Sequence, residues 1–457
     1  MATSTIKGVA TRDIITDCIE TTTTASRNHI KGTYFMMNGL LYRADEGIAI
    51  GTALIPDENC TKVTITDELY SRKARKVSLS YADIATIVQN GNARDHFEIG
   101  DQINVRWTNS GNVYDLPWDI VDFSDAVDAN GTTKPAMWLE SHYALPGVQF
   151  DASEALYYCD AALAPGTYYF TIGTNWGAHC ISGKNYYFTT TTTIPSGGQI
   201  VLANGTNYFT WGAPDVDPSN WKVYTFSSNT STTPLEGGLL LTEGISGTSL
   251  GTTTSSIKYG SCEINNLQRA AYGYNRWTHS GLRQYLNSNA VAGAWWSAQN
   301  NHDRPPQQFS SMSGFIAGLP TDFADIIHPV RISTVLNEAS DSEIGTSELT
   351  NDRFFLASLA QEFIVPQLPG AEGLPWDYWE QVLTDGPQKY YQSSSMTNAD
   401  IGHIRYAIEN HNSPQTCRLR SANRDNAHHA WLVTSTGYVS TSYSTYAARF
   451  CPACVII

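Results

Sequence analysis

Few residues in this 457-residue chain are spaced for chemistry, and the clearest pair lies near the end. Cys451 and Cys454 have the C-x-x-C spacing of a redox dithiol or of half a zinc site. No second C-x-x-C accompanies them in the sequence, and no helix pattern begins there that would lower a thiol pKa. We therefore predict two buried structural thiols on opposite faces of an apolar terminal strand.

Two further groups have the residue types of a metal site. His428 and His429 lie near Asp425, but neighbouring residues of a strand point apart, and two histidines in a loop are usually exposed polar groups. Asp215 and Asp217 have a carboxylate spacing suited to calcium. They lack the loop glycine and the final glutamate of an EF-hand, so a plain turn is expected.

One motif has the form of a hydrolase nucleophile. Gly247-Thr248-Ser249-Leu250-Gly251 matches G-x-S-x-G, which needs a helix after the serine. A Thr/Ser run follows instead, so the stretch Gly244 to Ser256 is predicted to be a loop or linker. No carboxylate pair and no Ser/His/Asp set stands out as a reaction centre. The prediction is a protein that is not an enzyme and has no cofactor and no metal.

The composition favours adhesion over nucleic-acid binding. Only 16% of the residues are charged, against about 25% in an average globular protein, while Thr, Ser, Asn, Gly and 25 Tyr are abundant. The net charge of −15 and the lack of a basic stripe argue against nucleic acid or an anionic membrane as partner. No segment reaches the length of a membrane span, and residues 1–24 lack the apolar region of a signal peptide. We expect synthesis in a cytoplasm, no membrane insertion, and eight reduced cysteines rather than a disulfide scaffold.

Patterning divides the first part of the chain into two segments. Residues 1–70 are predicted to form a small β-module, because Asn38-Gly39 between two apolar runs is a strong hairpin signal. Residues 71–150 are predicted to be an α+β segment that could pack with the C-terminal domain. Its helix, residues 81–89, should begin after Ser80 with Asp83 in the capping box, and strands should follow at 97–105 and 118–123.

The rest of the chain divides again near residue 258. Residues 151–258 are predicted to be a β-sandwich or jelly roll, with strands at 166–172, 185–188 and 194–202. Residues 259–457 show helices after Ser280 and at 322–328, a hairpin at 430–439 and a buried final strand at 447–457. The predicted fold class is multi-domain, mainly β with α+β parts.

The residues between 420 and 446 have the composition of a binding surface. Tyr supplies rigid amphipathic contact area, and small polar residues supply adaptable hydrogen bonds. The alternative is an ordinary polar loop of a β-domain, and Trp431 could belong to the core. The predicted ligand-binding residues are Asn423, Arg424, Asp425, Asn426, His428, His429, Tyr438, Ser440, Ser442, Tyr443, Thr445 and Tyr446.

Five motifs follow one another along residues 270–450: Tyr272–Trp277, Ser280–Asn287, Asp352–Ser358, Leu419–Ser421 and Ala448–Phe450. In this order they resemble a C-terminal domain of unknown function that is widespread in gut bacteria and their phages. That domain is similar to the C-type lectin-like domains of phage tropism determinants and of the variable proteins of diversity-generating retroelements. Two positions depart from the pattern: Cys417-Arg418 stands where relatives often have an aromatic pair, and Ala447 to Phe450 replaces a Gly-Val-Arg-Pro.

The N-terminal β pattern is similar to the opening of phage appendage proteins, and residues 97–122 resemble a portion found beside the same C-terminal domain. The resemblance implies a virion protein with a lectin-like C-terminal domain, in which residues 151–258 would be an inserted sandwich. Its N-terminal module would attach to other virion proteins. Its C-terminal loops would bind a glycan or protein of the host surface, and the chain would be a homo-oligomer such as a trimer. The loops are also rich in Asn, Tyr, Ser and His, which are the residue types found at the diversified positions of the variable proteins of diversity-generating retroelements.

Two rival functions stay open. A head fibre or capsid decoration protein would have a structural or mucus-adhesive role. A surface glycan-degrading enzyme, or a relative of formylglycine-generating enzymes, would share the lectin-like fold, although no paired carboxylates or activated cysteine support it.

Overall fold

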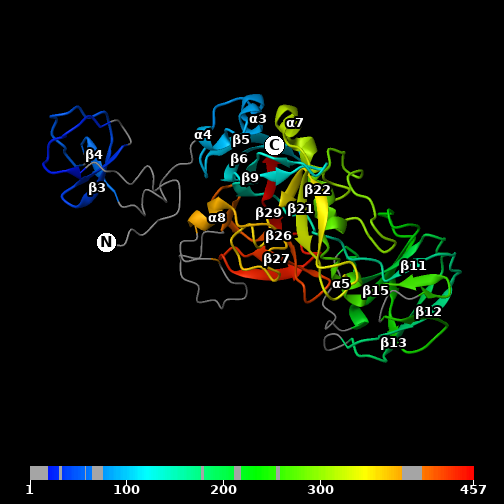
Figure 1. The fold of residues 1–457 in the computed structure, drawn as a ribbon. Helices are drawn as coiled ribbons and strands as arrows, with labels where there is room; N and C mark the ends of the chain where they lie inside the picture. Colours follow the sequence, from blue (N-terminus) through cyan, green and yellow to red (C-terminus); the bar gives the residue numbers. More distant parts are fainter. Residues whose placement is uncertain are drawn as a thin grey trace.

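The computed structural model describes residues 19–29, 33–56, 58–63, 76–175, 180–209, 218–253, 258–382, 387 and 404–457. These residues form a mainly β protein with short helices (Figure 1). Three parts can be recognised, namely an N-terminal module, a β-sandwich and a mixed body that contains the C-terminus. The turn predicted at Asp215 and Asp217 lies outside the described residues.

The N-terminal module is a small sheet around a tight hairpin. Asn38 and Gly39 both have positive φ, 54° and 74°, as the two-residue turn requires, and the predicted hairpin is confirmed. A separate apolar core that includes Phe35, Tyr42 and Leu54 lies under the sheet. In sheet order the strands are β1 (Ile19–Glu20), β2 (Tyr34–Met37), β3 (Leu40–Ala44) and β4 (Cys60–Lys62).

The body is built on a central sheet that joins segments from opposite ends of the chain. Strand β9 pairs antiparallel with β30, so that Leu139 lies opposite Cys454. Figure 1 shows these strands, cyan and red, in the same part of the molecule. A single apolar core contains residues from 84–150 and from 277–457. In sheet order the strands are β23 (Phe354–Leu356), β30 (Pro452–Ile456), β9 (Met137–Ser141), β6 (Asn112–Asp122) and β5 (Gln102–Asn109).

Short capped helices cover this core. Ser80 Oγ accepts a hydrogen bond from the Asp83 backbone N–H at 3.2 Å and donates to the Asp83 carboxylate at 2.6 Å, which confirms the predicted start of α3. Ser280 Oγ caps α6 by accepting from the Arg283 backbone N–H at 3.2 Å, while it donates to the Trp277 carbonyl at 2.9 Å. The helices are α3 (Tyr81–Gln89), α4 (Ala93–His96), α5 (Leu267–Tyr272), η2 (Trp277–His279), α6 (Gly281–Leu286), η3 (Phe315–Gly318), α7 (Thr321–Ile326) and α8 (Asp377–Val382).

A second sheet of the body carries the predicted binding residues. The hairpin predicted at 430–439 is confirmed as β27 and β28, and the sheet order is β28 (Val439–Tyr443), β27 (His429–Val433), β26 (Cys417–Ala422) and β29 (Arg449–Phe450). Smaller pairings complete the body: β21 (Val330–Val335) with β22 (Ser347–Asp352), β10 (Tyr143–Ala144) with β24 (Arg405–Ala407) and β25 (Pro414–Gln415), and β7 (Ala126–Val127) with β8 (Thr133–Lys134).

Residues 157–264 form two sheets whose inner faces share one core, in which Tyr157 and Trp221 meet Phe170 and Phe188. One sheet has the order β16 (Glu236–Leu240), β15 (Trp221–Phe226), β14 (Gln199–Asn204), β11 (Tyr157–Cys159), β20 (Cys262–Ile264) and β19 (Lys258–Tyr259). The other has the order β17 (Thr242–Glu243), β13 (Asn185–Thr190), β12 (Gly166–Thr171) and β18 (Thr248–Thr252). A short helix, η1 (Pro218–Asn220), precedes β15.

The linker predicted at 244–256 is wrong. Residues Thr248–Thr252 form β18, which pairs in parallel with β12, and Leu250 is buried in the sandwich core. The Gly- and Thr-rich composition did not indicate a strand, because β18 is stabilised by pairing with β12, which lies about 80 residues earlier in the chain. Ser249 therefore lies on a strand and not at a strand-to-helix turn.

Buried polar groups join the sandwich to the body. On the two segments that flank the sandwich in the chain, Glu154 forms a two-pronged ion pair with Arg269, at 2.8 Å to Nε and 2.7 Å to Nη2. Gln199 donates to the carbonyl oxygens of Asn301 and Asp303, at 2.7 and 3.2 Å. These buried bonds fix the sandwich on the body. Among the helices of the described residues, none is both long and apolar enough to cross a bilayer.

Candidate functional site

Aromatic rings from α5, the loop 423–429 and the β27–β28 hairpin lie in contact, and Tyr446 follows the hairpin with its backbone N–H donating to the Tyr443 carbonyl at 3.0 Å. We call Tyr272, His428, His429, Tyr443 and Tyr446 the aromatic patch. The Tyr443 ring stacks on the Tyr272 ring with centroids 3.8 Å apart and an angle of 7° between planes. His428 also stacks on Tyr272, at 5.3 Å, and His429 lies 4.9 Å from Tyr443.

Exposure within the aromatic patch is graded from buried to open. Tyr272 is 2% exposed and His428 is 6% exposed, whereas Tyr443 is 38% and Tyr446 50% exposed. Tyr272 and His428 therefore form a buried base, and Tyr443 and Tyr446 are the members of the patch that are open to solvent. Large aromatic groups held in this way are typical of binding surfaces, because little conformational entropy is lost when they meet a ligand.

Asn275 fixes the loop beneath the patch. Its side chain is fully buried, and its Nδ2 lies within 2.7–3.1 Å of the carbonyl oxygens of Asn423, Asn426 and His429. The Asn275 backbone N–H also donates to the Ala427 carbonyl at 3.0 Å. One buried amide thus organises the whole loop 423–429.

Arg418 does the same for the hairpin. Its Nη1 donates to the carbonyls of Ala430 and Ser442, at 2.8 and 3.0 Å, and its Nη2 to those of Tyr443 and Tyr446, at 2.9 and 3.2 Å. The side chain is almost fully buried, and no ion pair with a carboxylate is found for it within the described part of the chain. Burial lowers the pKa of Arg418 to about 9, so the guanidinium stays charged at neutral pH.

The two histidines are neutral near physiological pH. Burial, reinforced by the neighbouring His429, lowers the pKa of His428 to about 3. Burial and the charge of Arg418 lower the pKa of His429 to about 4. The exposed-histidine expectation is wrong for His428, because its ring packs on Tyr272 instead of facing water. The patch is therefore an uncharged aromatic surface.

Several predicted ligand residues support the loop from within. Arg424 is 8% exposed, and its guanidinium donates to the carbonyls of Leu336 and Thr346 and forms an ion pair with Glu338. Asn423 is buried, and its Oδ1 accepts from the Asp425 N–H at 2.9 Å.

Asn426 and Thr445 also act locally. The Asn426 side-chain oxygen accepts from the backbone N–H groups of His428 and His429, at 3.2 and 2.8 Å. Thr445 is 5% exposed, and its N–H donates to the Tyr272 carbonyl at 3.0 Å. These bonds hold the backbone of the loop and of the segment after β28 in place.

Other predicted residues lie beside or away from the patch. Asp425 is exposed at the loop tip. Ser440 and Ser442 are half-buried on β28 and alternate with Tyr443, so they face the other side of the strand. Tyr438 precedes β28 at its opposite end, about 16 Å along an extended chain from Tyr443. Trp431 is fully buried and its Nε1 donates to Gln367 at 3.1 Å, so the core alternative for Trp431 is confirmed.

Sequence reasoning missed three functional supports, namely Tyr272, Asn275 and Arg418. Tyr272 and Asn275 belong to the Tyr272–Trp277 motif, which was a signal for their structural role. Arg418 was noted only as a departure from the aromatic pair of relatives. Two arginines, Arg418 and Arg420, that flank Leu419 in a buried strand were the available signal, because a buried guanidinium must find several acceptors.

The other chemical candidates have structural roles. Cys451 and Cys454 are both buried free thiols, as predicted, but only Cys454 lies on the terminal strand, because β30 begins at Pro452. Burial raises the pKa of each thiol well above its usual value. Among the described residues, no group of three or more His, Cys, Asp or Glu side chains is arranged to hold a metal ion.

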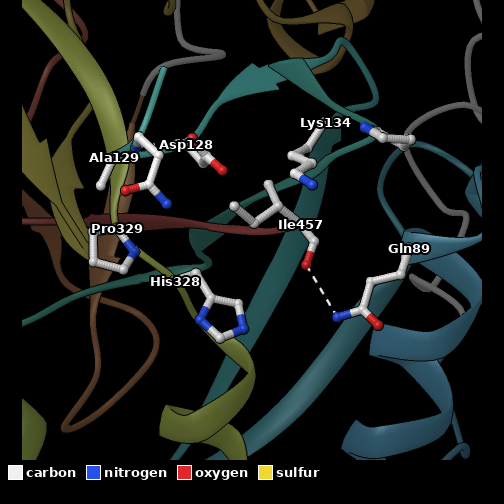
Figure 2. Close-up of a pocket in the computed structure, with 9 residues that line it drawn as sticks. Gln89, Asp128, Ala129, Lys134, His328, Pro329 and Ile457 are labelled. Carbon is white, nitrogen blue, oxygen red and sulfur yellow. Dashed lines mark hydrogen bonds between the residues drawn. The ribbon is translucent and has the colours of Figure 1, made fainter. Parts of the chain in front are cut away.

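A cavity of about 510 Å³ lies at another place in the body (Figure 2). Lys134, Asp128 and His328 line it, and Gln89 of α3 donates to the Ile457 carbonyl at 3.2 Å beside it. None of its lining residues belongs to the aromatic patch. The cavity marks the junction of α3, the β7–β8 connection and the end of β30.

Comparison with known proteins finds a match to one protein family. Residues 238–457 are similar to a protein family described as a domain of unknown function (DUF6273). The similarity begins within β16 of the sandwich and includes the entire aromatic patch and its supports. No curated protein and no solved structure matches the chain.

Proposed function

We propose that the chain is a phage virion protein that binds a glycan or protein of the host surface through the aromatic patch. The observation that carries the proposal is the exposed Tyr443 ring stacked on buried Tyr272 at 3.8 Å. Binding of this kind involves no covalent chemistry.

The supports of the patch favour recognition over an ordinary polar loop. Asn275 and Arg418 together take up seven carbonyl oxygens of the loop and the hairpin, which holds the backbone beneath the patch in place. Preorganisation of this kind reduces the entropy that a ligand must offset on binding. The cost of burying Arg418 is therefore consistent with selection for a fixed surface.

The chemistry of the patch suits an uncharged ligand. Tyrosine faces pack against the apolar C–H faces of sugar rings or against apolar side chains, while Tyr hydroxyls and the loop amides offer hydrogen bonds. Both histidines are neutral, so no charged partner is required. A small patch gives weak single-site binding, and several copies on one particle, as in a trimer, would supply avidity.

The domain arrangement supports the virion assignment. We infer that the N-terminal module, which has its own core, attaches the chain to other virion proteins. We also infer a C-type lectin-like scaffold for the body. Its resemblance motifs meet at Asp352, whose buried carboxylate accepts from Trp277 Nε1 at 2.9 Å and from Arg283 Nε at 2.7 Å.

The test is binding of the labelled full-length chain to a panel of bacterial strains, with surface glycans intact or enzymatically removed. Tyr443→Ala should weaken binding about 30-fold, because loss of an aromatic hot spot costs roughly 2 kcal/mol or more. Tyr443→Phe keeps the stacked ring and should bind nearly as well as the parent. Tyr406→Ala is the matched control, because Tyr406 is 39% exposed on β24.

Two outcomes would count against the proposal. Equal loss of binding in Tyr406→Ala and Tyr443→Ala would show that the aromatic patch is not the site. Binding of the chain to purified virion proteins but to no bacterial strain would favour a head fibre or decoration role.

A further inference from the structure

Two cysteines on neighbouring strands of the sandwich lie in direct contact. Cys159 ends β11 and Cys262 begins β20, and the two residues are register partners in the antiparallel pair. Their sulfur atoms are 3.4 Å apart, and both side chains are fully buried. The sequence places them 103 residues apart, which is why it favoured isolated thiols.

The backbone geometry at this pair suits a covalent bond. The Cys159 N–H donates to Gly198 and its C=O accepts from Gly197, so both backbone groups point toward β14 and away from β20. Cys159 and Cys262 are therefore a non-hydrogen-bonded pair, whose Cα atoms lie about 4.5 Å apart in antiparallel sheets. Disulfides span Cα separations of roughly 4.4–6.8 Å, so small side-chain rotations can bring the sulfur atoms to bonding distance.

We propose that Cys159 and Cys262 form a disulfide when the chain meets an oxidising environment, and that this bond closes the base of the sandwich. The bond would join β11 and β20, which are the first and last strands of the sandwich along the chain. Strands β12 to β19 would therefore lie inside one covalent loop. A cut within that loop would then leave both pieces attached to the body. This inference is independent of the proposed binding function.

The reaction is thiol–disulfide exchange with a small external disulfide such as oxidised glutathione. The Cys262 thiolate attacks one glutathione sulfur, which breaks the S–S bond and releases one glutathione thiolate. The Cys159 thiolate then attacks the Cys262 sulfur of the mixed disulfide and releases the second glutathione thiolate. The two protein thiol protons pass to the two released thiolates, so the protein loses two hydrogens and one glutathione disulfide is reduced.

Once the two sulfurs are in contact, the contact itself makes Cys262 the more acidic thiol of the pair. The hydrogen bond with Cys159 lowers the pKa of the Cys262 thiol, against the effect of burial. The same hydrogen bond and burial raise the pKa of Cys159. Because both sulfurs are buried in the folded sandwich, exchange should be fast while the sandwich folds and slow once it is complete.

The experiment refolds the full chain from denaturant with oxidised glutathione, and in parallel with reductant, followed by peptide mapping without reduction. The expected product is one cross-linked peptide pair that contains Cys159 and Cys262 and is lighter by two hydrogens. Cys454→Ser should leave this cross-link intact, whereas Cys159→Ser and Cys262→Ser should each abolish it. A single protease cut between residues 160 and 261 should separate the chain into two pieces on a denaturing gel only after reduction.

Recovery of free thiols at both positions after oxidative refolding would overturn the proposal, as would a dominant cross-link between other cysteines, such as Cys417 with Cys451. If refolding yields aggregates, native chain treated with dithiodipyridine in mild denaturant provides the second measurement. Coupled loss of Cys159 and Cys262 thiols there supports the proposal, and independent loss contradicts it.

Discussion

Replacing Arg418 by lysine keeps the positive charge but should disorganise the binding hairpin. The Arg418 fork reaches two pairs of carbonyls, Ala430 with Ser442 and Tyr443 with Tyr446. A single ammonium on an unbranched chain can reach at most one of these pairs. The variant therefore loses at least two charge-assisted hydrogen bonds while its charge stays buried.

The magnitude follows from those two bonds. Hydrogen bonds to charged groups contribute about 1.5–3 kcal/mol each, so Arg418→Lys should lower the free energy of unfolding by roughly 3–6 kcal/mol. For a unit of 150–250 residues, each kcal/mol corresponds to about 2–4 °C in Tm, which predicts a decrease of roughly 6–24 °C. Ligand binding should weaken with it, because Tyr443 and Tyr446 lose their fixed backbone.

Thermal unfolding followed by near-UV circular dichroism measures the first effect, and binding to cells measures the second. Arg331→Lys is the control, because Arg331 is exposed on β21 and the only hydrogen bond of its side chain among the described residues is a 3.5 Å contact with the Ala129 carbonyl. A Tm for Arg418→Lys within 2 °C of the parent, with unchanged binding, would refute the anchoring role of Arg418.

Three other changes test separate parts of the account. Asn275→Asp should destabilise the loop by about 3 kcal/mol or more, because a carboxylate would face three carbonyl oxygens, and calorimetry against Asn275→Ala measures the difference. His428 and His429 have folded-state pKa values of about 3 and about 4, below the ordinary 6.5. As the pH falls, these histidines therefore take up protons in the unfolded chain before they do so in the folded chain. The contribution of the two histidines to the free energy of unfolding should be complete above pH 6.5 and decline as the pH falls toward 3, while ligand binding stays constant from pH 7 to 8. A maximum of stability near pH 4 in urea titrations would contradict this. Oxidation of the Cys159–Cys262 pair closes a 103-residue loop and should add about 4.7 kcal/mol to the sandwich, measured as a shift in the urea midpoint that Cys159→Ser removes.

Features that depend on a few neighbouring residues could be predicted from the sequence. The Asn38-Gly39 turn and the Ser80 and Ser280 caps are local, because each is decided by residues within a few positions of one another. The hairpin at 430–439 was predictable for the same reason. The burial of both Cys451 and Cys454 followed from an apolar run at the end of the chain.

Pairings between distant segments could not be predicted. The strand β18 has a linker composition and is held only by β12, and the contact of Cys159 with Cys262 depends on closure of the whole sandwich. The candidate site shows the same division. Its loop was identified from composition, but the separation of exposed Tyr443 from buried Arg424 required knowledge of what packs beneath the loop.

The central claim is that the aromatic patch binds a host-surface receptor. The most direct measurement is competition, in which purified full-length chain is added to host cells before particles that carry the same chain. The account predicts that the parent chain and Tyr406→Ala block adsorption, and that Tyr443→Ala, folded with the parent Tm, does not. Equal blocking by Tyr443→Ala and the parent would contradict the account.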